Sequence, residues 1–344
     1  MKRRLSPGNQ VAPTELERVL RKVQTDLQEA CKATILWWDH KNIDDDDISA
    51  LLFCVKRNTC LRALILRGNK IANHGAMQLA NIIQYNKTIK ILDLDRNDIS
   101  AQGAAYLADA IKEHPCLTTL TLKNNFIGDE GAESLATSLK TNKCLCTLSL
   151  NGAHIGDQGA VALACTIKRN SSITAISLNR NHIGDRGASA IGDALRDKVV
   201  LGVIAFAYAL HNNDLEVIAE LSSLSTLKTL HLSENCIGVE GAKAISAGVS
   251  CNSALEELSL EGNKIGNEGA KAIANDLLRF NSALRKLYLY GDGIGDEGCN
   301  AIADALRVNK SLKLLRLTRH EMSDSCKSAL LESVRARAFS LIMV

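Results

Sequence analysis

A short alternation of apolar and polar residues, followed by apolar residues at helical spacing, recurs along almost the whole chain. Leu117 to Asn142 contains one complete copy, in which Leu120-Thr-Leu122 alternates like a short strand with one buried face. Asn125 follows the strand, and Asp129 is the candidate N-cap of a helix. The apolar residues of that helix lie on one face: Ala132, Leu135, Ala136 and Leu139. Each copy therefore predicts one strand and one helix.

The asparagine after each predicted strand sets the period of the repeat. Asn69, Asn97 and Asn125 lie 28 residues apart (97 − 69 and 125 − 97), as do Asn235 and Asn263 (263 − 235). Continuing this count along the chain predicts eleven repeats. In the six repeats not yet named, the position holds Lys41, Ala153, Asn181, Ala209, Asp292 and His320. A strand-and-helix unit repeated at this period predicts an α/β solenoid, in which each repeat packs only on its neighbours.

A glycine recurs at the entry to each predicted helix, where a side chain would crowd the neighbouring repeat or the turn would need unusual dihedral angles. A phosphate-binding loop is the wrong interpretation, because the fragment GDEG recurs as an architectural turn would and no Walker lysine follows it. The glycines are Gly75, Gly103, Gly131, Gly159, Gly187, Gly241, Gly269 and Gly298.

The repeat breaks down in two places. The seventh unit, over 197–225, has Ala209 in the asparagine position and Leu210 to Asp214 in place of the usual glycines. It predicts a local distortion, with a binding feature at Tyr208, His211 and Asn212 as the alternative. The last repeat replaces asparagine by His320 and glycine by Cys326, which indicates a C-terminal cap.

The chain divides into four segments. Residues 1–12 have no periodicity and predict a disordered leader, and 13–33 predict a helix that caps the first repeat, opened by the capping-box pair Thr14 and Glu17. The repeat domain spans 34–334. The tail, 335–344, is expected to pack as a helix, although a C-terminus captured in a pocket is the alternative.

The first repeat has two unusual features. Trp38 takes a buried leucine position, so Trp37 should face outward from the strand. The run Asp44 to Asp47 lacks the spaced ligands and the glycine of a calcium loop. It precedes an apolar helical pattern, which favours a helix N-terminus over a metal site.

Composition narrows the class of protein. The 344 residues are 46% hydrophobic but only 3% aromatic, as expected where Leu, Ile and Ala fill a narrow repeated core, and we expect a single repeat domain. The formal net charge is +3, from 41 basic and 38 acidic residues, so no global field favours nucleic acid or an anionic membrane. No apolar stretch reaches the length of a membrane span. We expect a cytoplasmic monomer.

The 11 cysteines are odd in number, dispersed and without a C-x-x-C pair, which predicts reduced thiols. Cys116 and Cys144 should be stacked neighbours, and a disulfide between them is the alternative. No His and Cys residues show the spacing of zinc ligands, so we expect no metal and no cofactor.

The unit at Leu117 to Leu139 and again at Ile173 to Leu195 resembles the ribonuclease-inhibitor-like class of leucine-rich repeats. This class includes the domains of NOD-like receptors, the Ran GTPase-activating protein and LRR-only bacterial effectors that act in the host cytosol. The resemblance implies a right-handed horseshoe with a parallel sheet on the concave face and helices on the convex face. It also implies a non-catalytic scaffold, whose variable concave residues bind a protein partner.

The residues that flank the strand leucines should point to the concave face. A partner-binding cluster is expected near the C-terminus, because Tyr and Arg are enriched in interface hot spots. The candidate residues, from both ends of the sheet, are Trp37, Asp39, Arg67, Asp95, Tyr208, Glu234, Glu261, Tyr288, Tyr290, Arg316 and Arg319. The concave list also includes Asp93 toward the N-terminus and His231 toward the C-terminus. The middle of the sheet has mostly small polar residues at these positions, among them Thr121, Ser149 and Ser177.

Two enzyme-related alternatives remain. Resemblance to the Ran activator, with Arg67 and Arg96 on the concave face, raises GTPase activation, although the long acidic tail of that protein is missing here. Acid/base catalysis by Asp39, His40 and Asp95 is the other, but an open wall offers neither a water-excluding pocket nor an evident nucleophile. Ribonuclease inhibition is disfavoured, because a basic enzyme favours an acidic concave face and this chain is slightly basic.

Overall fold

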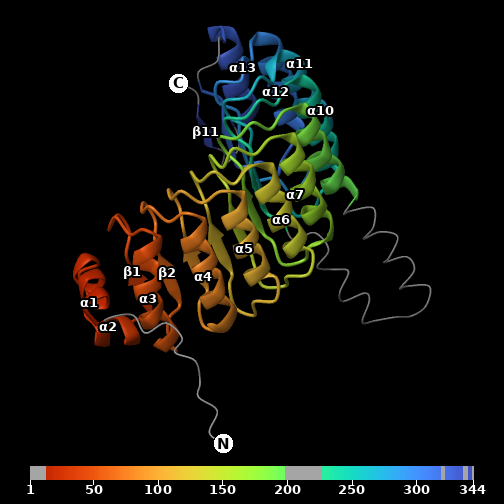
Figure 1. Ribbon diagram of the computed structural model, residues 1–344. Coiled ribbons are helices and arrows are strands. Elements are labelled where there is room, and N and C mark those ends of the chain that lie inside the picture. Colours follow the sequence, from red (N-terminus) through yellow and green to blue (C-terminus); the bar gives the residue numbers. More distant parts are fainter. Residues whose placement is uncertain (1–12, 198–226, 319–321, 336–339, 343–344) are drawn as a thin grey trace, which may run out of the picture.

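A computed structural model describes residues 13–197, 227–318, 322–335 and 340–342 of the chain. All its strands lie in one eleven-stranded sheet, in chain order from β1 to β11, and each described pair is parallel. Figure 1 shows a curved solenoid with the strands along the inner wall and the helices along the outer wall. The predicted α/β solenoid is confirmed.

The strands are short and regularly placed: β1 Ile35–Trp37, β2 Ala63–Ile65, β3 Ile91–Asp93, β4 Thr119–Thr121, β5 Thr147–Ser149, β6 Ala175–Ser177, β7 Thr229–His231, β8 Glu257–Ser259, β9 Lys286–Tyr288, β10 Leu314–Arg316 and β11 Ser340–Ile342. The convex helices are α3 Asp45–Arg57, α4 Asn73–Tyr85, α5 Ala101–Ile111, α6 Gly128–Leu139, α7 Asp157–Arg169, α10 Val239–Ser250, α11 Gly266–Ala272, continued by the π-helix η1 Ile273–Leu278, α12 Asp296–Val308 and α13 Asp324–Val334. Residues 185–197 are also helical.

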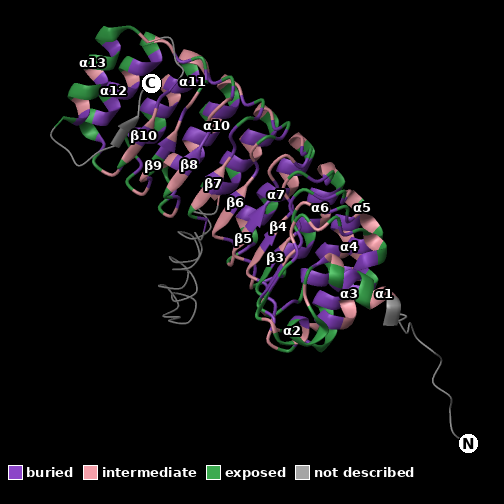
Figure 2. Cartoon of the chain, turned by 90° about the vertical axis from the view of Figure 1, so that its left-hand side faces the viewer, coloured by how far each residue is buried: buried purple, intermediate pink, exposed green. Residues whose placement is uncertain are grey.

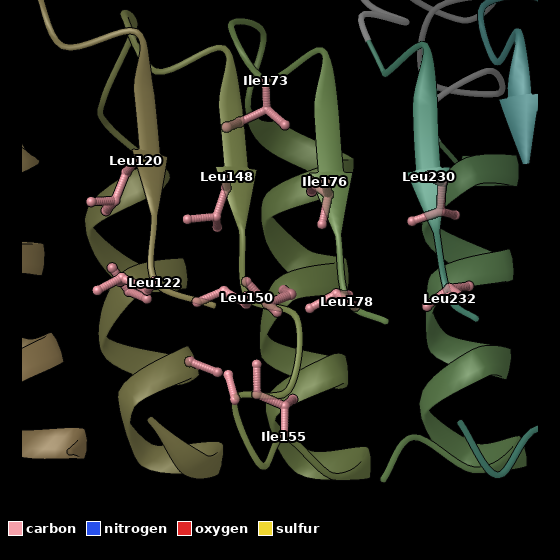
Figure 3. Close-up of a cluster of buried hydrophobic side chains, with 14 of the residues drawn as sticks. Leu120, Leu122, Leu148, Leu150, Ile155, Ile173, Ile176, Leu178, Leu230 and Leu232 are labelled. Atoms are coloured by element: carbon pink, nitrogen blue, oxygen red, sulfur yellow. The ribbon is translucent and has the colours of Figure 1, made fainter. Parts of the chain in front are cut away.

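The core consists of rows of leucine and isoleucine that run through successive repeats. Leu120 and Leu122 are fully buried, and strand pairing places Leu120 beside Leu148 of the next repeat. Figure 3 shows the same two rows continuing to Leu230 and Leu232, and Figure 2 shows buried residues in every repeat. Because each such side chain contributes roughly 1.5–3 kcal/mol when buried, the solenoid is stabilised repeat by repeat.

The repeated asparagine joins neighbouring repeats. Asn125 Nδ2 donates to the Leu94 carbonyl at 2.9 Å and to the Leu122 carbonyl at 3.1 Å, while its Oδ1 accepts from the Ile99 amide at 3.0 Å. One buried side chain therefore satisfies three backbone groups that the turn leaves unpaired. Asn69, Asn97, Asn181, Asn235 and Asn263 make the same set of bonds.

The helix-entry glycines are required by close packing. A Cβ at Gly131 would lie 2.6 Å from Ile127 Cγ2 of its own repeat and 3.1 Å from Ala104 Cβ of the preceding repeat. This confirms the predicted crowding. The predicted N-cap role of Asp129 is wrong, because its Oδ1 accepts from the amides of Gly156 and Gly159, at 2.7 and 2.9 Å. Asp129 therefore caps α7, the helix of the next repeat.

Strands β6 and β7 are neighbours in the sheet, although the predicted seventh repeat lies between them in the sequence. Strand β6 pairs directly with β7, and the Ile183 amide donates to Asn235 Oδ1 at 3.0 Å, the bond that Ile155 makes to Asn181. A step of 54 residues (235 − 181) here replaces the usual 28. The sequence predicts a distorted repeat over 197–225, but the direct pairing of β6 with β7 leaves no strand between them in the sheet. Ala209, Tyr208, His211 and Asn212 lie outside the described residues.

Two short helices lie at the N-terminal end, where one capping helix was expected. They are α1 Pro13–Lys22 and α2 Leu27–Lys32, and Val19 and Ala30 are buried in the core. Arg18 and Lys22 of α1 form ion pairs with the buried Asp47 of α3, Arg18 NH2 at 2.6 Å. Burial raises the pKa of Asp47, but hydrogen bonds from Lys22, the Asp44 amide and Arg18 outweigh burial and lower it.

Asp44 and Asp47 form a capping box at the start of α3, which confirms the helix N-terminus predicted for the aspartate run. At the other end, the tail contributes strand β11, which pairs with β10. The expected helical packing of the tail is therefore wrong. A strand here satisfies the backbone groups that β10 would otherwise expose at the edge of the sheet.

Candidate functional site on the concave face

Strand pairing aligns one residue from each of the strands β1 to β10 into a row along the concave face. The row contains every candidate predicted for this strand position, and it reads Trp37, Ile65, Asp93, Thr121, Ser149, Ser177, His231, Ser259, Tyr288 and Arg316. Because the residues between them are buried leucines and isoleucines, this row and its flanking residues make a continuous surface that faces away from the helices.

Arg316, Glu261 and Tyr290 come together near the C-terminal end of the sheet. Arg316 NH1 lies 3.4 Å from Glu261 Oε1, and its Cζ lies 5.3 Å from the centre of the Tyr290 ring. Burial raises the pKa of Glu261. The charge of Arg316 opposes this rise, and the charge of Glu234 adds to it. The guanidinium is thus held between a carboxylate and an aromatic face, in a cation–π arrangement.

A second network lies next to this cluster. Glu257 accepts from His231 Nε2 at 3.1 Å and from Lys286 Nζ at 2.9 Å. Burial raises the pKa of Glu257, but the hydrogen bonds from Lys286 and His231 outweigh burial and lower it. Sequence reasoning missed Glu257 and Lys286. Both are the first residues of their strands, β8 and β9, where outward direction follows from the same alternation that was applied to Tyr288.

Asp292 occupies the asparagine position beneath this end of the sheet. Its Oδ1 accepts from the Asn263 amide at 2.8 Å, whereas its Oδ2 is buried without a hydrogen-bond partner. In the preceding repeat, Asn263 Nδ2 fills the equivalent place and donates to the carbonyls of Leu232 and Leu260. Burial raises the pKa of Asp292 to about 8, so its carboxyl is largely protonated at neutral pH.

An apolar patch lies at the N-terminal end of the same surface, formed by Ile35, Trp37, Ile65 and Ile91 of strands β1 to β3. The Trp37 side chain is 65% exposed, Ile35 is 51% and Ile91 is 38% exposed. Only Trp37 was predicted. The signal for the three isoleucines is present in the sequence, because each flanks a buried leucine of its strand.

The other candidates are placed less favourably for contact with a partner. Asp95 is 5% exposed, and it accepts from the Lys123 amide at 2.8 Å and pairs with Lys123 Nζ at 3.6 Å. Exposed Glu234 forms an ion pair with Arg180 at 3.0 Å. Asp39 is half-buried and Arg67 is exposed. Tyr208 and Arg319 lie outside the described residues.

The proposed acid/base group has no support from this geometry, because Asp95 is already engaged by Lys123.

Among the described residues, no three or more His, Cys, Asp or Glu side chains are grouped to hold a metal ion. Cys116 and Cys144 are free thiols. None of the described helices combines the length and the apolar character that crossing a membrane requires.

Comparison with known families identifies the repeat. Seven segments match the model described as "Leucine Rich repeat": residues 57–80, 85–108, 113–136, 141–164, 169–192, 223–246 and 251–274. Three of these segments begin at the last residue of a helix (57, 85 and 169) and three begin within two residues after a helix (113, 141 and 251). These six segments end within the helix of the next repeat, and the segment at 223–246 ends within α10. No curated protein matches the chain.

Solved structures with a similar arrangement share little sequence with the chain. Leiomodin-1 actin-binding site 2 is 24% identical over 41% of this chain and 79% of that one, with a TM-score of 0.34. Internalin InlF from Listeria monocytogenes is 16% identical over 95% and 93%, with a TM-score of 0.44. TLR13 in its complex with ssRNA13 is 17% identical over 84% of this chain and 33% of that one, with a TM-score of 0.48.

Proposed function

Because this chain is a leucine-rich-repeat protein, we propose that it is a non-catalytic scaffold that binds a protein partner on its concave face. The observation that carries the proposal is the apolar patch around Trp37, whose side chain is 65% exposed on an open sheet. Contiguous exposed apolar side chains are uncommon on soluble proteins and mark interaction surfaces. Tryptophan is also among the residues that contribute most to binding energy at interfaces.

Rigidity of the wall supports the proposal. Leu36, Leu64 and Leu92, which alternate with the patch residues, are almost fully buried, and Asn69 and Asn97 bond the turns that follow the strands. The patch is therefore held in place before a partner arrives. A preformed surface loses little conformational entropy on binding, which favours affinity.

The cluster of Tyr288, Tyr290 and Arg316 forms the second part of the proposed surface. Its paired charges give it a polar character that contrasts with the apolar patch. Charged networks at an interface contribute more to the choice of partner and to the association rate than to affinity. We assign anchoring to the apolar patch and selectivity to this cluster.

The proposal extends to the class of leucine-rich repeat and to the cellular location of the protein. A full helix in nearly every repeat and a period of 28 residues support the ribonuclease-inhibitor-like class. The free thiols support a reducing, cytoplasmic location. GTPase activation rests on Arg67 and Arg96 alone; since both are simply exposed residues after their strands, we do not propose it.

The test is a binding measurement with a partner captured from lysate and then purified. Trp37→Ala should weaken binding on the order of tenfold or more, and Tyr290→Ala with Arg316→Ala should weaken it by a smaller factor. Tyr85→Ala is the matched control, because Tyr85 is 77% exposed at the end of α4, away from the sheet. Equal affinities for the Trp37, Tyr290/Arg316 and Tyr85 variants would show that the concave face is not the binding surface.

A further inference from the structure

Three sulfur-containing residues replace the repeat's usual residues at the C-terminal end. In the repeat before, Gly298 packs in a triangle with Ile294 of its own repeat and Ala270 of the preceding one: a Cβ on Gly298 would lie 2.8 Å from each. One period later the same three positions hold Cys326 (326 − 298 = 28), Met322 (322 − 294 = 28) and Cys299 (299 − 270 = 29). The closest contact point between two repeats thus becomes a group of three sulfur atoms.

Cys299 interacts with both of the other side chains: its Sγ lies 2.8 Å from Met322 Sδ, and its thiol and the Cys326 thiol perturb each other's pKa. Cys326 Sγ also donates to the Asp296 carbonyl at 3.7 Å. Cys299 is fully buried on α12 and Cys326 is 2% exposed on α13. Met322 is only partly buried, so an ion can reach the group from the Met322 side.

We propose that Cys299, Met322 and Cys326 form a binding site for a soft monovalent metal ion, Cu(I), between the last two convex helices. Thiolate and thioether sulfur are soft ligands, and they select Cu(I) over the harder divalent ions. Structural zinc sites need four ligands from Cys, His or carboxylate side chains. The described part of the chain groups no three such side chains here, which leaves zinc with an incomplete ligand set.

Binding requires no change in oxidation state. Cu(I) forms bonds to the two cysteine sulfurs and to the methionine sulfur, and each thiol releases its proton to solvent, so two protons leave for each ion bound. The methionine contributes a neutral ligand. The bound ion would link α13 to α12 and stabilise the end of the solenoid.

The test is an anaerobic titration of the reduced full chain with Cu(I) bicinchoninate, in which the protein competes for the metal. The wild type should remove one ion per chain with a saturable profile and show a thiolate-to-copper absorption band. Cys299→Ala with Cys326→Gly restores the residues of the regular repeat, so the fold should persist while the saturable uptake is lost. Met322→Ile, likewise the regular residue, should weaken the uptake.

Cys54→Ala is the matched control. Cys54 is buried at the other end of the solenoid, where desolvation and Cys31 contribute to raising the pKa of its thiol. This variant should take up Cu(I) as the wild type does. Uptake unchanged in the Cys299/Cys326 variant would overturn the proposal. So would a Zn²⁺ titration in which zinc binds the wild type more tightly than Cu(I) and loses that binding in the same variant.

Discussion

At the scale of single residues, the repeated asparagine position can hold either an amide or a carboxyl side chain. The carboxyl makes the free energy of unfolding depend on pH. Asn263 and Asp292 occupy equivalent places, and both accept a backbone amide through Oδ1. Only asparagine has a second group that donates to carbonyls without first taking up a proton. The buried Oδ2 of Asp292 therefore makes the stability of this repeat sensitive to pH.

Asp292→Asn should remove a pH dependence of stability. The pKa of Asp292 rises from 3.8 to about 8 on folding, so the folded chain binds the extra proton. The stability contributed by the protonated carboxyl is present below pH 3.8 and is lost as pH rises to about 8. Denaturant unfolding across this range should show the wild type losing on the order of a few kcal/mol relative to Asp292→Asn.

Asp98→Asn is the control for this experiment, because Asp98 is exposed. Its unfolding free energy should follow the wild type at every pH. If Asp292→Asn also follows the wild type across the whole range, the carboxyl is not buried in the protonated form.

The strand register rests on which side chains face the core. Leu122 is fully buried, so Leu122→Asp should leave a charge without a partner in the core and destabilise the protein by about 3 to 5 kcal/mol. Thr119→Asp, on the concave side of the same segment, should change the free energy of unfolding far less. The measurement is chemical denaturation of both variants. An unchanged midpoint for Leu122→Asp would refute the register.

At the scale of elements, local pattern predicted most of the structure. The alternation around Leu120 and the helical spacing after Gly131 placed β4 and α6 correctly. The pattern could not show which helix Asp129 caps. Asp129 lies at the start of α6 in the sequence, but its carboxylate accepts from amides at the start of α7, in the next repeat. It also could not show β11, since the tail has no repeat and its strand is defined by the edge of β10.

Asp129→Ala tests the assignment of this cap. The amides of Gly156 and Gly159 would lose their acceptor, and loss of a helix cap costs about 1 kcal/mol. Glu130→Ala, an exposed neighbour in the same turn, is the control and should be close to neutral. Hydrogen exchange should then be faster at the start of α7 in the Asp129 variant. Faster exchange at the start of α6 instead would return the cap to its own helix.

At the scale of the whole molecule, a solenoid has no single core, and its stability and its binding surface are both distributed along its length. The period of 28 predicted the number and order of the regular repeats, but counting positions assigned a repeat to 197–225 that pairing does not require. Periodicity alone cannot distinguish a drifted repeat from an inserted segment of nearly the same length. Only the direct pairing of β6 with β7 separates the two.

The sequence predicted which strand residues face the concave side, but it predicted only some of the residues in the candidate site. Alternation correctly placed Trp37, Tyr288 and Arg316 on the concave face. The apolar neighbours of Trp37 come from three different strands, so their contiguity depends on the stacking of repeats. That stacking is why Trp37 stands beside Ile65 across the sheet.

Burial of Trp37 by a partner is the most direct test of concave-face binding. Hydroxyl-radical footprinting of the complex with the purified partner reports the solvent exposure of Trp37 and of Tyr85 in one experiment, and the two side chains are 65% and 77% exposed in the free protein. The account predicts that the partner protects Trp37 from oxidation and leaves Tyr85 unchanged. Protection of Tyr85 with Trp37 unchanged would contradict it.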